Sequence, residues 1–217
     1  MGGVAATPCC CTEVTGDGAT ETVKLVTASP AVEEGFATPS VGGQFTTCLQ
    51  HHPQMAGFNI DITDGISLVI ADIQRVNAVW GGPNMTLRQH DRIIEANGVS
   101  GEAAGLMKVL RSAETWNLTV QRPAEFQAEI SRQGHESLGL ELQFAPNGTS
   151  LMIAGVGKGP IQDWNEKSPD NAIRKGDRIV EVNRVRGVSR DLLHAAKAED
   201  VLRLCILRYT SDSLDPA

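Results

Sequence analysis

Two short stretches of the sequence have residue types that could bind an anion through the backbone. Each places a glycine directly before an alternating strand pattern, in Gly57-Phe-Asn-Ile60 and Gly139-Leu-Glu-Leu142. A glycine-containing turn that leads into a strand can direct successive backbone N–H groups at one point, which forms an anion-binding nest. Glycine suits such a turn because a side chain would block an approaching carboxylate or strain the backbone. The pattern therefore predicts two sites for a carboxylate-bearing ligand.

The remaining motifs offer weaker chemistry. Gly155-Val-Gly-Lys-Gly159 lacks the ending of a phosphate-binding loop, and a connection to a helix that begins at Pro160 explains it better. Cys48, His51 and His52 make only half of a zinc site. The chain has no Gly-x-Ser-x-Gly motif and no recognisable nucleophile. We therefore expect no catalytic activity, no metal and no cofactor.

The N-terminus offers a second kind of chemistry, covalent acylation. Gly2 is followed by Cys9, Cys10 and Cys11, but the myristoylation pattern requires Ser or Thr where this chain has Ala6. A single myristoyl chain binds membranes only marginally, so the cysteines would have to carry a second acyl chain. The alternative is an unmodified tail.

The composition excludes some classes of partner. The chain has 217 residues, 41% of them hydrophobic, and a net charge of −7, so it has no basic stripe for nucleic acid. No apolar run of about 18 residues and no secretory leader occurs, which predicts neither a membrane span nor secretion. Three of the five cysteines are adjacent, a poor disulfide framework, so we expect reduced thiols. These features predict a cytoplasmic protein, either free or peripheral to the cytosolic face of a membrane.

An internal repeat organises most of the chain. Asp91-Arg-Ile-Ile-Glu-Ala-Asn-Gly-Val-Ser-Gly101 matches Asp177-Arg-Ile-Val-Glu-Val-Asn-Arg-Val-Arg-Gly187 at seven of eleven positions, with an offset of 86 residues. Upstream, Ser67-Leu-Val-Ile-Ala71 matches Ser150-Leu-Met-Ile-Ala154 with an offset of 83. Length changes that fall in loops are what two copies of one fold should show.

The sequence patterns of the two copies predict the same strands and helices. Apolar residues first alternate with period two, which is typical of half-buried strands, and later recur every three or four residues, as Ala103, Leu106 and Leu110 do, which is typical of a helix. We expect about five strands and one or two helices in a copy. The expected parts are an acidic disordered tail at 1–43, a first domain at 44–122, a second domain at 126–209 and a flexible end at 210–217.

The order of these motifs resembles that of a PDZ domain, twice over. The second copy has Ser137-Leu-Gly-Leu140 and Lys175-Gly-Asp-Arg-Ile-Val-Glu-Val-Asn183, and then a helix and a final strand. The first copy has Met55-Ala-Gly-Phe58 and Leu87-Arg-Gln-His-Asp-Arg-Ile-Ile-Glu-Ala-Asn-Gly98. The resemblance implies a mainly β fold at the border with α+β, made of two tandem, partly open β-barrels.

The resemblance also implies a ligand and its site. An extended peptide, either a C-terminal tail or an internal segment, would add as a strand beside the one that follows each glycine, with the helix as the other wall. The residues that the resemblance assigns to these grooves are Met55, Ala56, Gly57, Phe58, Asn59, Ile60, Ala103 and Met107 in the first copy, and Arg132, Ser137, Leu138, Gly139, Leu140, Glu141, Leu142, Ser189 and Leu193 in the second.

Two positions depart from the family pattern. Many PDZ domains begin the groove helix with a histidine, where this chain has Ala103 or Ser189, so the class of peptide is not implied. His90 occupies the turn position that Gly176 occupies in the second copy, and histidine tolerates a positive φ better than most residues.

These observations predict a non-catalytic adaptor that binds peptides through one or both copies. One alternative is a structural subunit whose copies pack in a larger assembly and bind no free peptide. Another is a lipid-headgroup module that uses the basic cluster of Arg184, Arg186 and Arg190.

Overall fold

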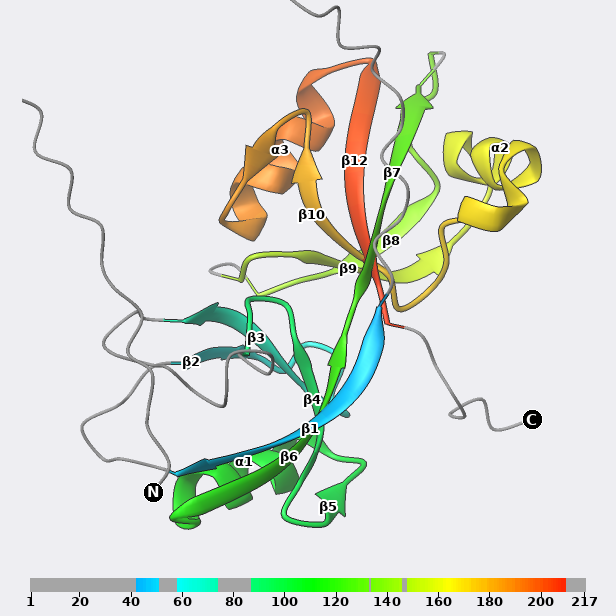
Figure 1. Cartoon of the computed structure of the whole chain (residues 1–217). Coiled ribbons are helices and arrows are strands. Elements are labelled where there is room, and N and C mark those ends of the chain that lie inside the picture. Colours follow the sequence, from blue (N-terminus) through cyan, green and yellow to red (C-terminus); the bar gives the residue numbers. More distant parts are fainter. Residues whose placement is uncertain (1–41, 51–57, 74–86, 133, 146–147, 210–217) are drawn as a thin grey trace, which may run out of the picture. The chain divides into compact units, whose positions relative to one another are not determined.

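The computed structural model describes residues 42–50, 58–73, 87–132, 134–145 and 148–209 (Figure 1). The predicted tail at 1–43 falls almost wholly outside these residues, and the predicted flexible end lies wholly outside them. The same holds for the acylation candidates Gly2, Cys9, Cys10 and Cys11, and for Met55, Ala56 and Gly57 of the first expected groove.

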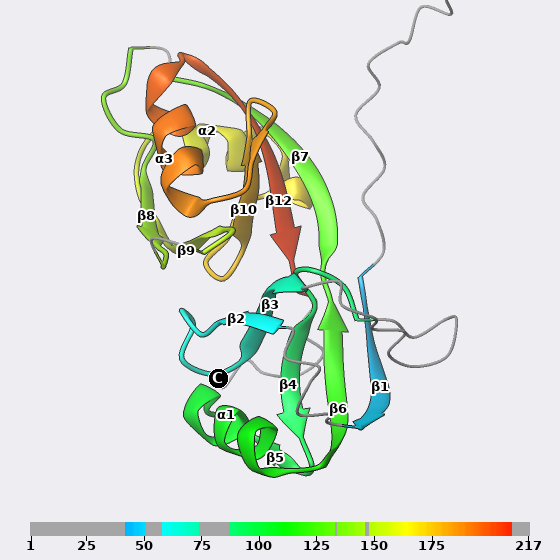
Figure 2. The same cartoon turned by 90° about the vertical axis from the view of Figure 1, so that its left-hand side faces the viewer.

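The first copy of the repeat forms one antiparallel sheet with a single described helix. Its elements are β1 (Gly43–Gln50), β2 (Phe58–Asp61), β3 (Leu68–Ile73), β4 (Arg92–Ala96), β5 (Val99–Ser100), α1 (Ala103–Ser112) and β6 (Thr115–Arg122). The strand order is β1-β6-β4-β3-β2, and the short β5 pairs with β4. Figure 2 shows this order across the sheet, with β2 at one side and β1 at the other.

The second copy forms a sheet of the same design. Its elements are β7 (Ala124–Ser131), β8 (Leu140–Gln143), β9 (Leu151–Val156), α2 (Pro160–Lys167), a short 3-10 helix (Pro169–Asn171), β10 (Arg178–Val182), β11 (Val185–Arg186), α3 (Ser189–Ala198) and β12 (Val201–Arg208). The order β7-β12-β10-β9-β8 repeats that of the first sheet. The predicted mainly β fold is confirmed, and each sheet has one two-residue strand more than the five expected. The domain limits at 44–122 and 126–209 stay a prediction.

The alternating patterns produce these strands because one face of each sheet is buried. In β7, Phe126, Ala128 and Ile130 are buried, whereas the residues between them are exposed. The helix α1 buries Leu106 and Leu110 on the face predicted from their spacing. Each sheet has its own apolar core, in which these side chains pack.

The Asp-Arg-Ile motif recurs because it holds a turn. The carboxylates of Asp91 and Asp177 accept hydrogen bonds from the backbone N–H groups three residues earlier, both at 2.8 Å. Each also pairs with the arginine at the end of the last strand, Arg122 at 2.8 Å and Arg208 at 2.6 Å. His90 has a φ of +69° where Gly176 has +90°, so the histidine adopts the turn geometry of the glycine.

Candidate functional site

The strands β2 and β8 each end their sheet. Within the described residues, β2 pairs only with β3, and β8 only with β9. An edge strand presents backbone N–H and C=O groups that can pair with a further strand. Both strands also carry a register shift at the same place, between Asn59 and Ile60 and between Glu141 and Leu142. The two edges are therefore equivalent by fold and by local geometry.

A cavity of about 480 Å³ lies between the end of β2 and the helix α1. Its walls are Ile62, directly after β2, and Ala104, Met107, Lys108, Arg111 and Ser112 of the helix. Ile62 is 52% exposed, a large value for an isoleucine beside a sheet. An apolar contact from a ligand would therefore remove much of the Ile62 side chain from water.

The helix side of this cavity is basic. Lys108 and Arg111 lie three residues apart on α1, so their side chains lie on the same face of the helix. Neither residue forms an ion pair with another residue in the described part of the chain. The cavity thus combines apolar surface with two cations that have no described carboxylate partner.

The residues predicted for the first groove are placed as follows. Met107 is half-buried and lines the cavity, and Asn59 and Ile60 belong to the edge strand, which Phe58 begins. Ala103 is 4% exposed and packs in the core, so its neighbour Ala104 lines the cavity instead. This difference arises because Ala103, Leu106 and Leu110 form the buried face of α1.

In the second copy, the turn at Gly139 is packed against the chain that follows β9. Gly139 has a φ of +78°, and a Cβ atom there would lie 2.7 Å from the carbonyl oxygen of Lys158 and 2.8 Å from that of Gly157. The N–H of Gly157 donates to the carbonyl of Gly139 at 2.8 Å, and that of Ile161 donates to Leu138 at 3.3 Å. Glycine is thus required here by close packing of the backbone, a reason different from the ligand approach expected from the sequence.

Two donors expected to bind an anion at this turn, the N–H of Gly139 and the guanidinium of Arg132, already have partners in the chain. The N–H of Gly139 donates to the Ser137 hydroxyl at 3.2 Å. Arg132, expected to help bind an anion, donates from Nε to the carbonyl of Glu199 at 3.1 Å and from Nη2 to that of Ala196. Its guanidinium therefore joins the start of this turn to the end of α3.

The start of α3 is held as well. Ser189 is completely buried, and its hydroxyl donates to the carbonyl of Ser150 at 2.9 Å. In the first copy the equivalent residue, Ala103, has no hydroxyl and donates only its backbone N–H, to Gly65 at 3.1 Å. Ser189 is thus enclosed, which differs from the expectation that it faces a peptide. Of the other residues predicted for this groove, Leu140, Leu142 and Leu193 are half-buried and Glu141 is exposed.

The basic cluster of the second copy is partly neutralised. Arg186 pairs with Glu181 and lies 3.8 Å from Glu125, whereas Arg184 and Arg190 are exposed. One of the three cations of this cluster is thus paired with carboxylates, and a role in binding a phosphate headgroup stays a prediction.

Other reactive groups are few in the described residues. Burial, together with Glu125, raises the pKa of the Cys205 thiol to about 12, which keeps this thiol protonated and unreactive. No group of three His, Cys, Asp or Glu side chains within these residues is arranged to hold a metal ion. No described helix has the length and apolar character needed to cross a membrane.

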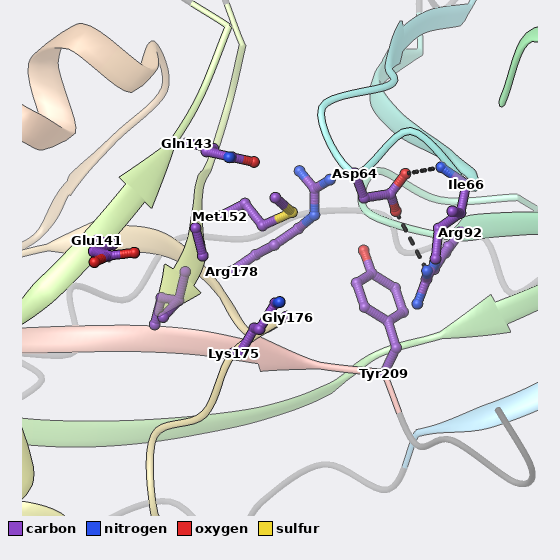
Figure 3. A pocket seen from close by; sticks show the side chains of 12 residues that line it. Asp64, Ile66, Arg92, Glu141, Gln143, Met152, Lys175, Gly176, Arg178 and Tyr209 are labelled. Atoms are coloured by element: carbon purple, nitrogen blue, oxygen red, sulfur yellow. Dashed lines mark hydrogen bonds and ion pairs between the residues drawn. The ribbon is translucent and has the colours of Figure 1, made fainter. Parts of the chain in front are cut away.

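The two copies also contact one another, which the sequence did not suggest. Arg178 of β10 pairs with Asp61 of β2 at 2.5 Å, and the Tyr209 hydroxyl donates to the carbonyl of His90 at 2.7 Å. A second cavity, of about 490 Å³, is lined by residues of both copies (Figure 3). The sequence carried no signal for this contact, because Asp61 lies between Ile60 and Ile62 on the alternate face of the strand pattern, which is ordinarily exposed to solvent.

Comparisons with known proteins show similarity to tandem PDZ structures. Two solved structures, titled "Structure of INAD PDZ45 in complex with NG2 peptide" and "Complex structure of INAD PDZ45 and NORPA CC-PBM", are 18% and 16% identical to this chain. They cover 82% and 83% of it and 96% and 97% of their own chains, with TM-scores of 0.36 and 0.34. No family model matches the sequence, and no curated protein matches it. At TM-scores of this size, the matches assign no function to this chain.

Proposed function

We propose that this protein is a non-catalytic interaction module that binds an extended peptide at the first copy, between β2 and α1. The cavity of about 480 Å³ at the end of the edge strand is the observation that carries this proposal. A peptide that adds to the free edge of β2 forms main-chain hydrogen bonds, and its alternate side chains enter the space beside the helix.

The chemistry of the cavity indicates the class of peptide. Ile62 and Met107 would contact an apolar side chain, and Lys108 and Arg111 would attract an acidic one. Because both cations are at the solvent-exposed surface, their attraction should contribute mainly to selectivity and should weaken as salt rises. We therefore propose a peptide in which an apolar residue lies close to Asp or Glu.

A peptide array tests this function. The full chain is screened against extended peptides with free or blocked C-termini, each in an acidic version and a version with Asn or Gln instead. Binding of selected peptides is then measured by fluorescence anisotropy. We expect the acidic versions to bind more tightly, and the difference to shrink between 50 mM and 500 mM salt.

Three matched variants locate the site. Met107→Glu should weaken binding by at least about tenfold, which corresponds to about 1.4 kcal/mol, because it places a charge against the apolar part of the ligand. Val201→Glu introduces the same carboxylate at an exposed position of β12 and should leave binding unchanged. Leu193→Glu changes the equivalent residue of α3. If Leu193→Glu abolished binding and Met107→Glu did not, the assignment to the first copy would be wrong.

A further inference from the structure

Arg92 and Arg178 are equivalent residues of the two copies, and both use an equivalent serine. Each directly follows the aspartate of its Asp-Arg-Ile motif, and the two arginines are 86 residues apart in the sequence. Arg92 donates from Nε to the Ser67 hydroxyl at 2.7 Å, and Arg178 donates from Nη1 to the Ser150 hydroxyl at 2.9 Å. Each guanidinium therefore donates to the equivalent serine of its own copy, although through a different nitrogen.

The two arginines differ in their carboxylate partner. Arg92 pairs with Asp64 of its own copy at 3.3 Å. In the second copy the sequence has Asn147 at the position of Asp64, so Arg178 has no corresponding carboxylate there. Arg178 instead pairs with Asp61 of the first copy, whose equivalent by strand register is Gln143. The second copy thus supplies a cation, and the first copy supplies the anion that the second lacks.

This ion pair is deeply buried. Arg178 is 1% exposed and Asp61 is 5% exposed, and such burial is unfavourable for either charge without the other. Contacts nearby also join the copies, since the ring of Tyr209 lies under the Arg92 guanidinium at 5.2 Å. Figure 3 shows Arg178 extending toward Asp64 and the Tyr209 hydroxyl. A buried pair adds little net stability, but removal of one partner is strongly unfavourable because the other charge is left buried and unpaired.

Asp61 connects this contact to the peptide cavity. It is the last residue of β2, and its carboxylate accepts hydrogen bonds from the N–H of Thr63 at 2.8 Å and from the Thr63 hydroxyl at 2.5 Å. Ile62, which lies between these two residues, lines the cavity beside α1. One carboxylate therefore holds both Arg178 and the turn that places Ile62.

We propose that Arg178 of the second copy is a positioning residue for peptide binding by the first copy. Through Asp61 it holds the end of β2 and the turn that carries Ile62, so the groove of the first copy has its binding geometry only while the two copies are in contact. This inference rests on the proposed function, because it takes β2 and α1 as the peptide site. It assigns the second copy a supporting role even if its own groove binds nothing.

Peptide affinity of the full chain tests this proposal. Arg178→Met keeps the unbranched apolar stem of the side chain and removes the guanidinium, and we expect it to weaken binding at the first copy about tenfold, within the range typical of coupled sites. Asp61→Asn should weaken binding by a similar factor, and the double variant should bind the peptide no more weakly than either single variant. Arg203→Met is the matched control, because Arg203 belongs to the same copy and pairs with Glu129 at the surface.

A second measurement, made without peptide, separates the two proposals. Hydrogen exchange of the backbone amides at 60–63 should be about tenfold faster in Arg178→Met than in the wild type, and unchanged in Arg203→Met. If the wild type binds no peptide, the proposed function is wrong, and the exchange result still decides whether Arg178 holds the end of β2. If peptide binds equally to the wild type and Arg178→Met, or if exchange at 60–63 is unchanged, the positioning role is refuted.

Discussion

At the scale of single residues, His90 occupies a turn position with a positive φ, which a glycine would adopt with less strain. It has the positive φ that Gly176 has in the second copy, and its Nδ1 is buried without a hydrogen-bond partner among the described residues. Burial, with Arg178 and Arg186 adding to it, lowers the pKa of the imidazole to about 4. The folded protein therefore keeps His90 neutral at pH values where the unfolded chain would protonate it.

This shift predicts a pH dependence of stability. Because the folded pKa lies below the unfolded value of 6.5, the unfolded chain binds the proton first, and stability falls as pH drops from about 6.5 to about 4. In the wild type, the free energy of unfolding should fall by an amount on the order of 2–3 kcal/mol between these two pH values, and in His90→Gly this fall should be absent. Urea denaturation at several pH values measures it.

The control for this prediction is His135→Asn. His135 is exposed and lies outside the turn that His90 occupies, so its replacement removes an imidazole without changing that turn. An unchanged profile in His90→Gly would show that another group causes the loss.

At the scale of elements, the glycine turn before β8 is a packing device. The carbonyl oxygens of Gly157 and Lys158 occupy the space where a Gly139 side chain would be, and the start of α2 donates to this turn. The turn, β9 and α2 therefore stabilise one another. A groove motif in the sequence can be retained for such packing alone.

Gly139→Ala should destabilise the second copy strongly. The positive φ alone should lower the free energy of unfolding by about 1–2 kcal/mol when an alanine occupies it. In addition, the new Cβ would lie 2.7 Å from the carbonyl oxygen of Lys158, so the turn would have to move. Gly134→Ala is a matched control, since Gly134 has a φ of +81° and open space around its Cβ position. We expect Gly139→Ala to lower the free energy of unfolding by at least about 1 kcal/mol more than Gly134→Ala. Equal losses in denaturant titrations would contradict the packing role.

The first turn of α3 permits a similar test. Ser189→Ala makes the second copy resemble the first, which has Ala103 at this position, and removes the hydrogen bond to Ser150. The expected loss is about 1 kcal/mol, without a change in peptide binding at the first copy. A change in that binding would mean that α3 contributes to the peptide site, either directly or through Ser150 and Arg178.

At the scale of the whole molecule, the buried pair of Asp61 and Arg178 joins the two copies. Burial opposes ionisation of Asp61, but Arg178 and the hydrogen bonds from Thr63 outweigh it, so the pKa lies below its usual value of 3.8. A lowered carboxyl pKa stabilises the folded protein above the unfolded value, and this contribution is lost as pH falls through the folded pKa. The contact between the copies should therefore persist at neutral pH and weaken only in strong acid.

A double-mutant cycle by chemical denaturation measures this coupling. Asp61→Asn and Arg178→Met should each destabilise the protein, whereas the double variant should cost no more than either, with a coupling energy of about 2 kcal/mol at pH 7. The exposed pair of Arg203 and Glu129 supplies the comparison, with an expected coupling below about 1 kcal/mol. Equal coupling in the two cycles would show that burial of the first pair has no energetic consequence.

The sequence by itself determined the mainly β fold and its duplication. Period-two burial in β7 and the buried face of α1 follow from local spacing, and the Asp-Arg-Ile motif recurs because the same turn needs the same carboxylate. These features depend on neighbours along the chain, or on one strand partner, so a single sequence contains the information. The same holds for the positive φ of His90, inferred from its match to Gly176.

Only the tertiary structure decided which predicted groove residues face a cavity. Ala103 and Ser189 are buried because the core takes the face of the helix on which they lie, and Arg132 is bound to the end of α3. The pairing of Asp61 with Arg178 joins residues 117 positions apart in different copies. Spacing within a copy carries no information on a contact between copies, because such a contact depends on how two finished surfaces meet.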